Sequence, residues 1–147
     1  MVCLGNICRS PLAEGIMKEK LRALGPGLHI DSAGTGAWHQ GEAPDKRSIE
    51  VAARYGLDIS GQRARAVIVE DFDLFDYIFA MDSSVYSTLI ERSAPEHHNK
   101  IHLLLEFAGM GEADVPDPWF GNREDFERVY GLLDEACAKA AARLRGQ

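Results

Sequence analysis

Apolar residues recur every three or four positions in four stretches of this 147-residue chain, and this spacing predicts four amphipathic helices. The stretches begin after Ser10, after Asp45, at Ser83 and at Asn122. Ser10 and Asp45 are suited to cap the first two helices, because a side-chain oxygen can accept a hydrogen bond from one of the first backbone N–H groups. Gly25 is expected to end the first helix.

Short and mostly apolar runs separate these helices. Residues 76–82 (DYIFAMD) and 100–107 (KIHLLLEF) are typical of strands buried on both faces of a sheet, and residues 28–34 (LHIDSAG) predict a further strand. Strands that alternate with helices indicate an α/β fold, in which helices cover both faces of a parallel sheet. Such sheets bind ligands where their strands end.

The beginning of the chain adds one more strand to this sheet. A chain of 147 residues is expected to form a single domain, residues 1–147. Because only Met1 and Val2 precede Cys3, we expect the first strand of this domain to be truncated at the N-terminus. The loop after this strand then lies at the carboxyl edge of the sheet, where a ligand is expected.

Composition narrows the function classes. The chain carries a formal net charge of -7 without a Lys/Arg stripe, which argues against nucleic acid as a partner. No apolar run approaches the roughly 18 residues of a membrane span. Three cysteines are an odd number without the spacing of a disulfide framework, which favours a reducing cytoplasm and a thiol kept for chemistry.

The motif CLGNICRSP, which begins at Cys3, has the chemistry of a phosphate site. Gly5 allows close approach of the backbone, and Asn6 tolerates the left-handed conformation of a curled loop. Inward backbone N–H groups, a helix N-terminus and the Arg9 guanidinium can together hold a phosphate dianion. The same field favours the thiolate of Cys3, which could attack phosphorus, and Ser10 could donate a hydrogen bond to it.

Two aspartates extend this chemistry. Pro118 favours an extended backbone at Asp117, whose carboxyl group could then project over the pocket. One carboxyl group at that place can protonate the leaving oxygen and afterwards activate a water. Asp82 ends a buried strand at the same edge of the sheet, where it could cap the following helix.

The motif CLGNICRSP resembles the active-site loop of the low-molecular-weight protein tyrosine phosphatases, and DSAGT, FDYIFAMD and DPWFG continue the resemblance along nearly the whole chain. The resemblance implies a flavodoxin-like, four-stranded parallel sheet and hydrolysis through a cysteinyl-phosphate, without a metal or a cofactor. It also implies that Asp117 is the general acid, that Asp82 holds Arg9, and that Ser32 helps to fix the loop. The implied phosphate-binding residues are Leu4, Gly5, Asn6, Ile7, Cys8 and Arg9.

The implied partner is a tyrosine-phosphorylated protein, which in bacteria can be a tyrosine kinase, and the enzyme is expected to be a monomer. Trp38, Trp119 and Phe120 lie on loops bounded by glycine and are expected to wall the pocket. Such an apolar slot above a phosphate cradle favours a flat phosphorylated ring over a short seryl stem.

Other functions remain open on the sequence alone. Relatives that act as protein arginine phosphatases resemble this loop but usually carry Thr where Ile7 stands, and the methyl surface of Ile7 favours an aryl ester. An arsenate reductase on the same fold needs further cysteines in mid-chain, and none lies between Cys8 and Cys137. A phosphopeptide-binding module would lack either the nucleophile or the acid, and this chain has both.

The second cysteine of the loop predicts redox sensitivity. A reactive thiolate at Cys3 is also easily oxidised, and a disulfide with Cys8 would keep the oxidation reversible. The alternative is that Cys8 only packs beneath the loop. Cys137 falls on the apolar face of the last helix and is expected to pack in the core.

Overall fold

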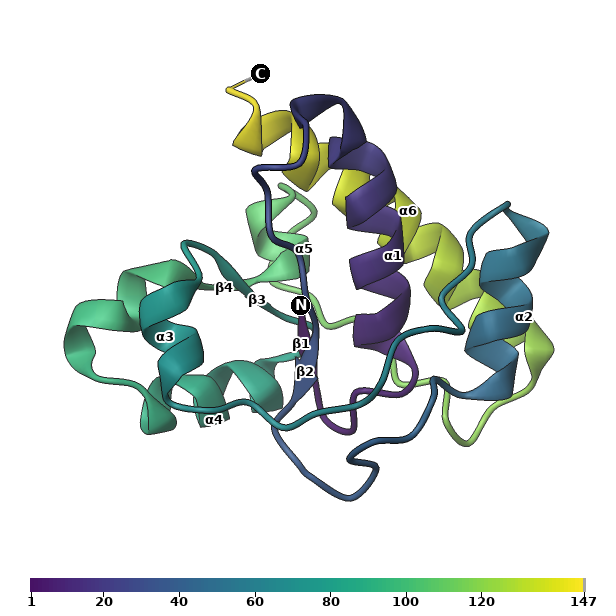
Figure 1. The fold of residues 1–147 in the computed structure, drawn as a ribbon, viewed down its shortest axis with the longest axis horizontal. Coiled ribbons are helices and arrows are strands. Elements are labelled where there is room, and N and C mark those ends of the chain that lie inside the picture. The colour runs from purple at the N-terminus through teal and green to yellow at the C-terminus, as the bar shows by residue number, and fades with distance from the viewer. Residues whose placement is uncertain (147) are drawn as a thin grey trace.

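A four-stranded parallel sheet lies at the centre of the computed structural model, which describes residues 1–146 (Figure 1). The strands follow the order β2-β1-β3-β4 and are β1 (Val2–Cys3), β2 (Ala33–Gly34), β3 (Ile78–Ala80) and β4 (Ile101–Leu103). All neighbouring strands pair in parallel. The predicted flavodoxin-like α/β fold is therefore confirmed.

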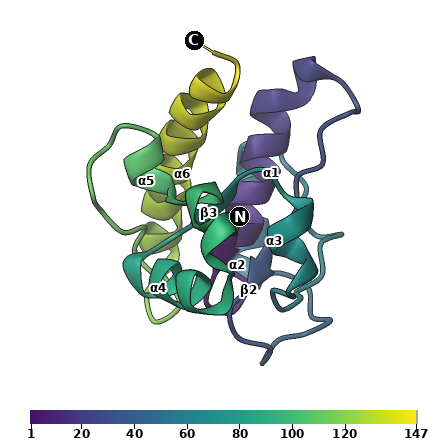
Figure 2. The same ribbon diagram turned by 90° about the vertical axis from the view of Figure 1, so that its left-hand side faces the viewer.

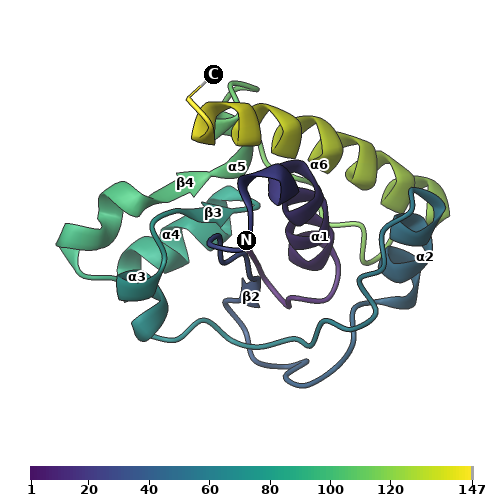
Figure 3. The same ribbon diagram turned by 45° about the horizontal axis from the view of Figure 1, so that its top comes forward.

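Helices connect these strands. They are α1 (Arg9–Leu21), α2 (Lys46–Arg54), α3 (Glu70–Leu74), α4 (Ser83–Arg92), α5 (Leu104–Phe107) and α6 (Arg123–Leu144), together with the 3₁₀ helices η1 (Arg22–Leu24) and η2 (Pro95–Lys100). Helix α6 lies along α1, as Figure 3 shows, and α3 and α4 lie at the other side of the sheet, facing the viewer in Figure 2.

Alternating side chains of the strands build a separate core on each face of the sheet. Val2, Ile78 and Ala80 are buried with side chains of α3 and α4. Cys3 and Phe79 point the other way and are buried with α1, α2, α5 and α6. This period of two is what a strand covered on both faces requires. It also places the Cys3 side chain on the α1 face of the sheet.

The loops that follow β1 and β2 gather at one end of the molecule, the lower end in Figure 1. Two backbone hydrogen bonds join these loops. The Thr35 N–H donates to the Cys3 carbonyl oxygen at 3.0 Å, and the Gly36 N–H donates to the Leu4 carbonyl oxygen at 2.9 Å. This end is the carboxyl edge of the parallel sheet, where ligands bind in such folds.

The predicted Ser10 cap of the first helix is wrong. Helix α1 begins two residues earlier than predicted, at Arg9, its N-cap position is Cys8, and no side chain caps it. Ser10 lies inside the first turn with its hydroxyl directed to the preceding loop. The helix also gives way to η1 at Arg22, and Gly25, with φ 88°, ends that 3₁₀ turn.

All three predicted strands are shorter than their runs suggested, and of residues 76–82 only Ile78–Ala80 form β3. Of residues 28–34, only Ala33 and Gly34 form β2, because only these two pair with β1. Of residues 100–107, only Ile101–Leu103 form β4, while Lys100 ends η2 and Leu104–Phe107 form the single helical turn α5. A short apolar run does not distinguish a buried strand from a buried helical turn, and here tertiary packing decided.

Candidate active site

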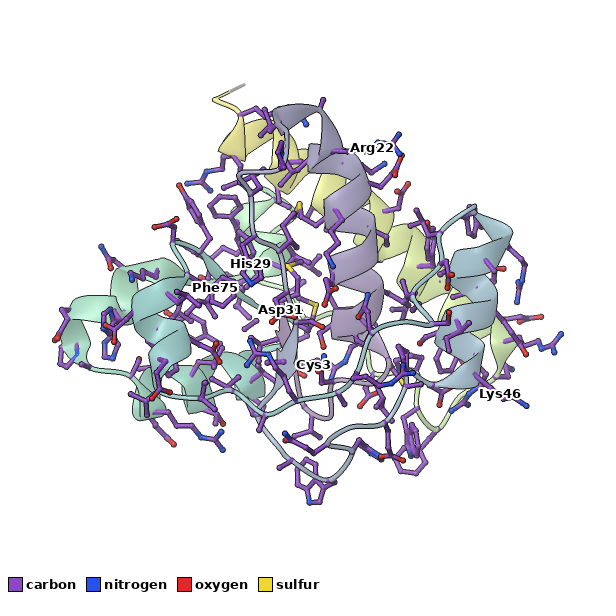
Figure 4. All side chains as sticks on the ribbon, viewed as in Figure 1. Cys3, Arg22, His29, Asp31, Lys46 and Phe75 are labelled. Atoms are coloured by element: carbon purple, nitrogen blue, oxygen red, sulfur yellow. The ribbon has the colours of Figure 1, made fainter. Side chains whose placement is uncertain are left out.

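The loop between β1 and α1 curls around the sulfur of Cys3. Asn6 is the one non-glycine residue with positive φ (58°) among those that the model describes, and this conformation turns the chain back on itself. The Asn6 N–H donates to Cys3 Sγ at 3.2 Å, and Cys3 is buried. Figure 4 shows Cys3 in the interior of the molecule, beside the start of α1. The fold thus presents the thiol at the floor of the loop.

A buried network of hydroxyl and amide groups supports this loop. Ser10 Oγ lies 3.0 Å from Cys3 Sγ, so the serine can donate to a thiolate there. The Asn6 amide donates to Ser10 Oγ at 2.8 Å and to Ser32 Oγ at 3.0 Å. The Arg65 N–H donates to the Asn6 side-chain oxygen at 3.0 Å. Asn6 therefore ties the loop to α1, to β2 and to the segment that follows α2.

Glu14 completes the network and was not foreseen. It is buried on α1, where Ser32 Oγ donates to Oε1 at 2.7 Å and Lys18 Nζ pairs with Oε2 at 2.6 Å. A glutamate four residues before a lysine usually indicates an exposed helical pair, so the sequence carried no signal of its burial. The Gln62 side-chain amide donates to the Pro11 carbonyl oxygen at 3.0 Å.

The Arg9 side chain is buried and held from two elements. One terminal nitrogen, Nη1, donates to Asp82 Oδ2 at 2.6 Å and to the Val115 carbonyl oxygen at 3.0 Å. The other, Nη2, lies 3.5 Å from Asp117 Oδ2. Burial by itself lowers the pKa of Arg9, but the charges and hydrogen bonds of Cys3, Asp82 and Asp117 raise it above its ordinary value. The guanidinium therefore stays charged and fixed in orientation.

Asp82 performs both of the tasks that the sequence left open. Its Oδ1 accepts from the Val85 N–H at 2.8 Å and caps α4, while its Oδ2 accepts from Arg9. A carboxylate at an N-cap satisfies orphan N–H groups with one oxygen and leaves the second free. Here that second oxygen orients the arginine.

Asp117 lies on the loop between α5 and α6. The Val115 N–H donates to the Met81 carbonyl oxygen at 2.8 Å, which holds the loop to the end of β3. The Trp119 N–H donates to Asp117 Oδ1 at 3.1 Å, and the other carboxylate oxygen faces Arg9. About half of the Asp117 side chain is exposed, so it stands at the edge of the pocket, as the extended Asp-Pro step predicted.

These groups share one pocket of about 330 Å³. Its lining joins the loop after β1 to three aromatic residues from two other loops, Trp38, Trp119 and Phe120. Trp38 and Phe120 are 70% and 97% exposed, so they form the rim, and Cys3 lies at the floor. Thiol, guanidinium, carboxyl group and predicted wall therefore come together.

His39 also lines this pocket and was not foreseen. Its ring lies 5.9 Å from that of Trp119, and its Nδ1 lies 2.6 Å from a carboxylate oxygen of Glu42. The sequence showed five scattered histidines without ligand spacing, and nothing marked this one. Its neighbour Trp38 offered an indirect signal, because both residues belong to one glycine-bounded loop.

The three cysteines are free thiols, and all three are buried. Burial raises the pKa of Cys8 to about 12, with smaller contributions from nearby Asp45 and Cys3. Burial likewise raises the pKa of Cys137 to about 12. Cys137 lies in the core between α6 and α1, where its sulfur is 3.8 Å from the Ala13 carbonyl oxygen, so it packs as predicted.

Two further features are absent from residues 1–146. No three His, Cys, Asp or Glu side chains among them gather as ligands of a metal ion. None of the helices that these residues form is long and apolar enough to cross a membrane.

Proteins similar to this chain in sequence and in fold include protein tyrosine phosphatases. The family model described as low molecular weight phosphotyrosine protein phosphatase matches residues 1–147. The chain belongs to this family. A low molecular weight protein-tyrosine-phosphatase of Synechocystis, itself described as putative, is 42% identical over 140 residues, which cover 92% of this chain and 88% of that protein. Low molecular weight phosphotyrosine protein phosphatase 2 of Drosophila melanogaster is 40% identical, with 93% of this chain and 85% of that protein covered.

Solved structures of the family share the whole fold of this phosphatase. A protein tyrosine phosphatase from Entamoeba histolytica, with Hepes in its active site, superimposes with a TM-score of 0.93 at 38% identity and covers 99% of this chain and 94% of that one. Wzb of Vibrio vulnificus, in complex with benzylphosphonate, gives a TM-score of 0.86 at 31% identity, with 97% of this chain and 94% of that one covered. The chain is therefore an enzyme of the phosphotyrosine phosphatase class.

Proposed function

We propose that this phosphatase hydrolyses phosphotyrosine in proteins through a cysteinyl-phosphate, with Cys3 as nucleophile and Asp117 as general acid and then base. The observation that carries the proposal is that one pocket is lined by the Cys3 thiol, the Arg9 guanidinium and the Asp117 carboxyl group. These are a nucleophile, an anion clamp and a proton donor, which phosphoryl transfer to a side chain requires.

In the first step, Cys3 Sγ attacks phosphorus and the P–O bond to the phenol breaks. The N–H groups of residues 4–9 and the planar fork of Arg9 hold the phosphoryl oxygens. The Asn6 N–H and the Ser10 hydroxyl, both within 3.2 Å of the sulfur, stabilise its thiolate before attack and when it leaves again. The implied binding residues Leu4, Gly5, Ile7 and Cys8 all line the same pocket.

Asp117 supplies and recovers the proton. As an acid it protonates the departing phenolic oxygen, and as a carboxylate it then takes a proton from the water that attacks the cysteinyl-phosphate. In the ligand-free pocket its Oδ2 lies 3.5 Å from Arg9 Nη2, beside the place where the phosphoryl group would sit. Each turnover releases the alcohol and inorganic phosphate and restores the thiolate.

The natural substrate that we propose is a tyrosine-phosphorylated protein, a bacterial tyrosine kinase being one candidate, and the enzyme is proposed to act as a monomer. The rim supports an aromatic phosphoester, because Trp38, Trp119 and Phe120 offer apolar faces above a polar floor. The side chain of Ile7 adds apolar surface at that floor.

Replacing the nucleophile tests the mechanism directly. We expect Cys3→Ser to abolish turnover of an aryl phosphate, because an unactivated hydroxyl is a far weaker nucleophile than a thiolate, yet to retain binding of vanadate or phosphate. Steady-state hydrolysis and isothermal titration calorimetry measure the two effects. Cys137→Ala is the matched control, since it removes a thiol from the core of α6, and it should stay active. Substantial turnover by Cys3→Ser would refute the covalent mechanism.

A further inference from the structure

Arg47, the second residue of α2, holds the loop that carries Asp117. Its Nη2 donates to the Trp119 carbonyl oxygen and its Nη1 to the Gly121 carbonyl oxygen, each at 3.2 Å. Its Nε and Nη2 also donate to the two carboxylate oxygens of Asp45, at 3.0 and 2.9 Å. One guanidinium thus joins the start of α2 to the far end of the Asp117 loop. Figure 4 labels the adjacent Lys46, which marks this place at the start of α2.

The plane of this guanidinium is fixed as well as its hydrogen bonds. The guanidinium carbon lies 4.4 Å from the centre of the Phe126 ring and 5.7 Å from that of Trp119. Phe126 is 1% exposed and belongs to the core under α6, so it provides an immobile surface. Stacking and forked donation together are a property of arginine and not of lysine.

The other end of this connection reaches the phosphate loop. The Asp45 N–H donates to the Ile7 carbonyl oxygen at 2.7 Å, so the start of α2 is tied to the loop around Cys3. Burial raises the pKa of Asp45, but the hydrogen bonds from Arg47 outweigh it and bring that pKa below its ordinary value. The Asp45–Arg47 pair is therefore charged at neutral pH.

The backbone of Trp119 connects Arg47 to the carboxyl group of Asp117. Its N–H donates to Asp117 Oδ1 at 3.1 Å, and its carbonyl oxygen accepts from Arg47. We propose that Arg47 is a positioning residue that sets the place of the Asp117 carboxyl group relative to the phosphate loop. The inference rests on the proposed role of Asp117 as general acid. Arg47 is not among the residues that line the pocket, so it would act through Trp119.

Removal of the Arg47 side chain should therefore slow protonation of the leaving group. We expect Arg47→Ala to lower kcat/KM by roughly 10- to 100-fold on phosphotyrosine or alkyl phosphates, the scale of loss when a reacting group is misplaced by about 1 Å. The loss should be small on esters of acidic phenols, which leave without a proton. KM should change little, because Arg9 and the phosphate loop stay in place. Arg47→Lys should resemble Arg47→Ala.

Two controls separate positioning from a general loss of structure. Arg54→Ala, on the same helix, removes an ion pair to Glu127 of α6 but no contact with the Asp117 loop, and it should keep the wild-type rate. The helix cap survives in Arg47→Ala, because Asp45 Oδ1 also accepts from the backbone N–H of residue 47 at 2.8 Å. Thermal melting checks that both variants are folded.

The decisive measurement is a double-mutant cycle with Asp117→Asn, read out as kcat/KM over a series of leaving groups, because kcat/KM reports the step in which the leaving group departs. If Arg47 acts through Asp117, Arg47→Ala should cause almost no further loss in the Asp117→Asn background. Undiminished loss in that background, or equal loss for all leaving groups, would overturn the positioning role. A slow Asp117→Asn beside an unchanged Arg47→Ala would overturn this inference alone. A fast Asp117→Asn would instead overturn the proposed acid, and the inference with it.

Discussion

Cys3 and Cys8 lie in one loop, but their surroundings give them different chemistry. Cys3 has two hydrogen-bonding groups directed at its sulfur, the Asn6 N–H and the Ser10 hydroxyl. Cys8 is buried without such support, and its pKa of about 12 keeps it a neutral thiol at pH 7. Only a thiolate is an effective nucleophile, so the two cysteines are suited to different roles.

The role of Cys8 is testable by oxidation. We expect peroxide to oxidise Cys3 to a sulfenic acid, which then condenses with the Cys8 thiol to form the S–S bond with release of water, a step that a thiol reductant can reverse. After brief peroxide and then reductant, wild type should recover most of its own untreated activity. Cys8→Ser should recover much less and show sulfinic acid at Cys3 by mass spectrometry. Equal recovery of both proteins would assign Cys8 to packing alone.

Helix α4 links the stability of an element to the activity of the site. Its cap residue, Asp82, also orients Arg9, so a single carboxylate serves both functions through different oxygens. A substitution that keeps the cap of α4 but removes the charge that faces Arg9 can therefore separate the two functions.

We expect Asp82→Asn and Asp82→Ala to lower activity to a similar degree, because both remove the charge that faces Arg9. Only Ala also removes the cap, so its free energy of unfolding should be lower than that of Asn by about 1 kcal/mol. Hydrolysis assays and urea denaturation measure the two quantities. Asp114→Asn is a control, since Asp114 contacts Ser83 at the same helix start without touching Arg9, and it should stay active. A stable but inactive Ala variant would argue against the cap.

The strand order brings the loops that line the pocket to one edge of the sheet. The floor of the pocket follows β1, Trp38 follows β2, and Trp119 and Phe120 come from the loop before α6. Because the apolar rim stands above a buried thiol, a substrate must place its phosphate deep in the pocket while its stem passes the aromatic side chains.

The buried position of Cys3 and the aromatic rim of the pocket together predict selectivity for phosphotyrosine over phosphoserine. On matched peptides, we expect kcat/KM for phosphotyrosine to exceed that for phosphoserine by about 10²-fold, since the short seryl stem cannot fill the slot or reach Cys3. A panel that also contains phosphoarginine tests the main alternative function. Comparable values for phosphotyrosine and phosphoserine would contradict the role of the aromatic wall, and a preference for phosphoarginine would reassign the substrate.

The sequence by itself determined the features that depend on near neighbours in the chain. The cap at Asp45 was predictable because its side-chain oxygen and the N–H group that it binds lie two residues apart. The curled loop from Cys3 to Arg9 was predictable because the residues that allow its curvature, Gly5 and Asn6, lie within the loop itself. Asp117 was recognisable because the following proline restricts its backbone, and the motifs of the resemblance gave it a role.

Tertiary structure alone decided the features whose partners are distant in sequence. Whether residues 104–107 extend a strand or form a helical turn depended on the neighbours that bury them. The buried carboxylate of Glu14 accepts a hydrogen bond from Ser32. The ring of His39 lies beside that of Trp119. Arg47 meets the Asp117 loop more than 70 residues further along the chain. Each contact exists because the strand order brings those loops to one edge of the sheet, and local periodicity carries no record of that order.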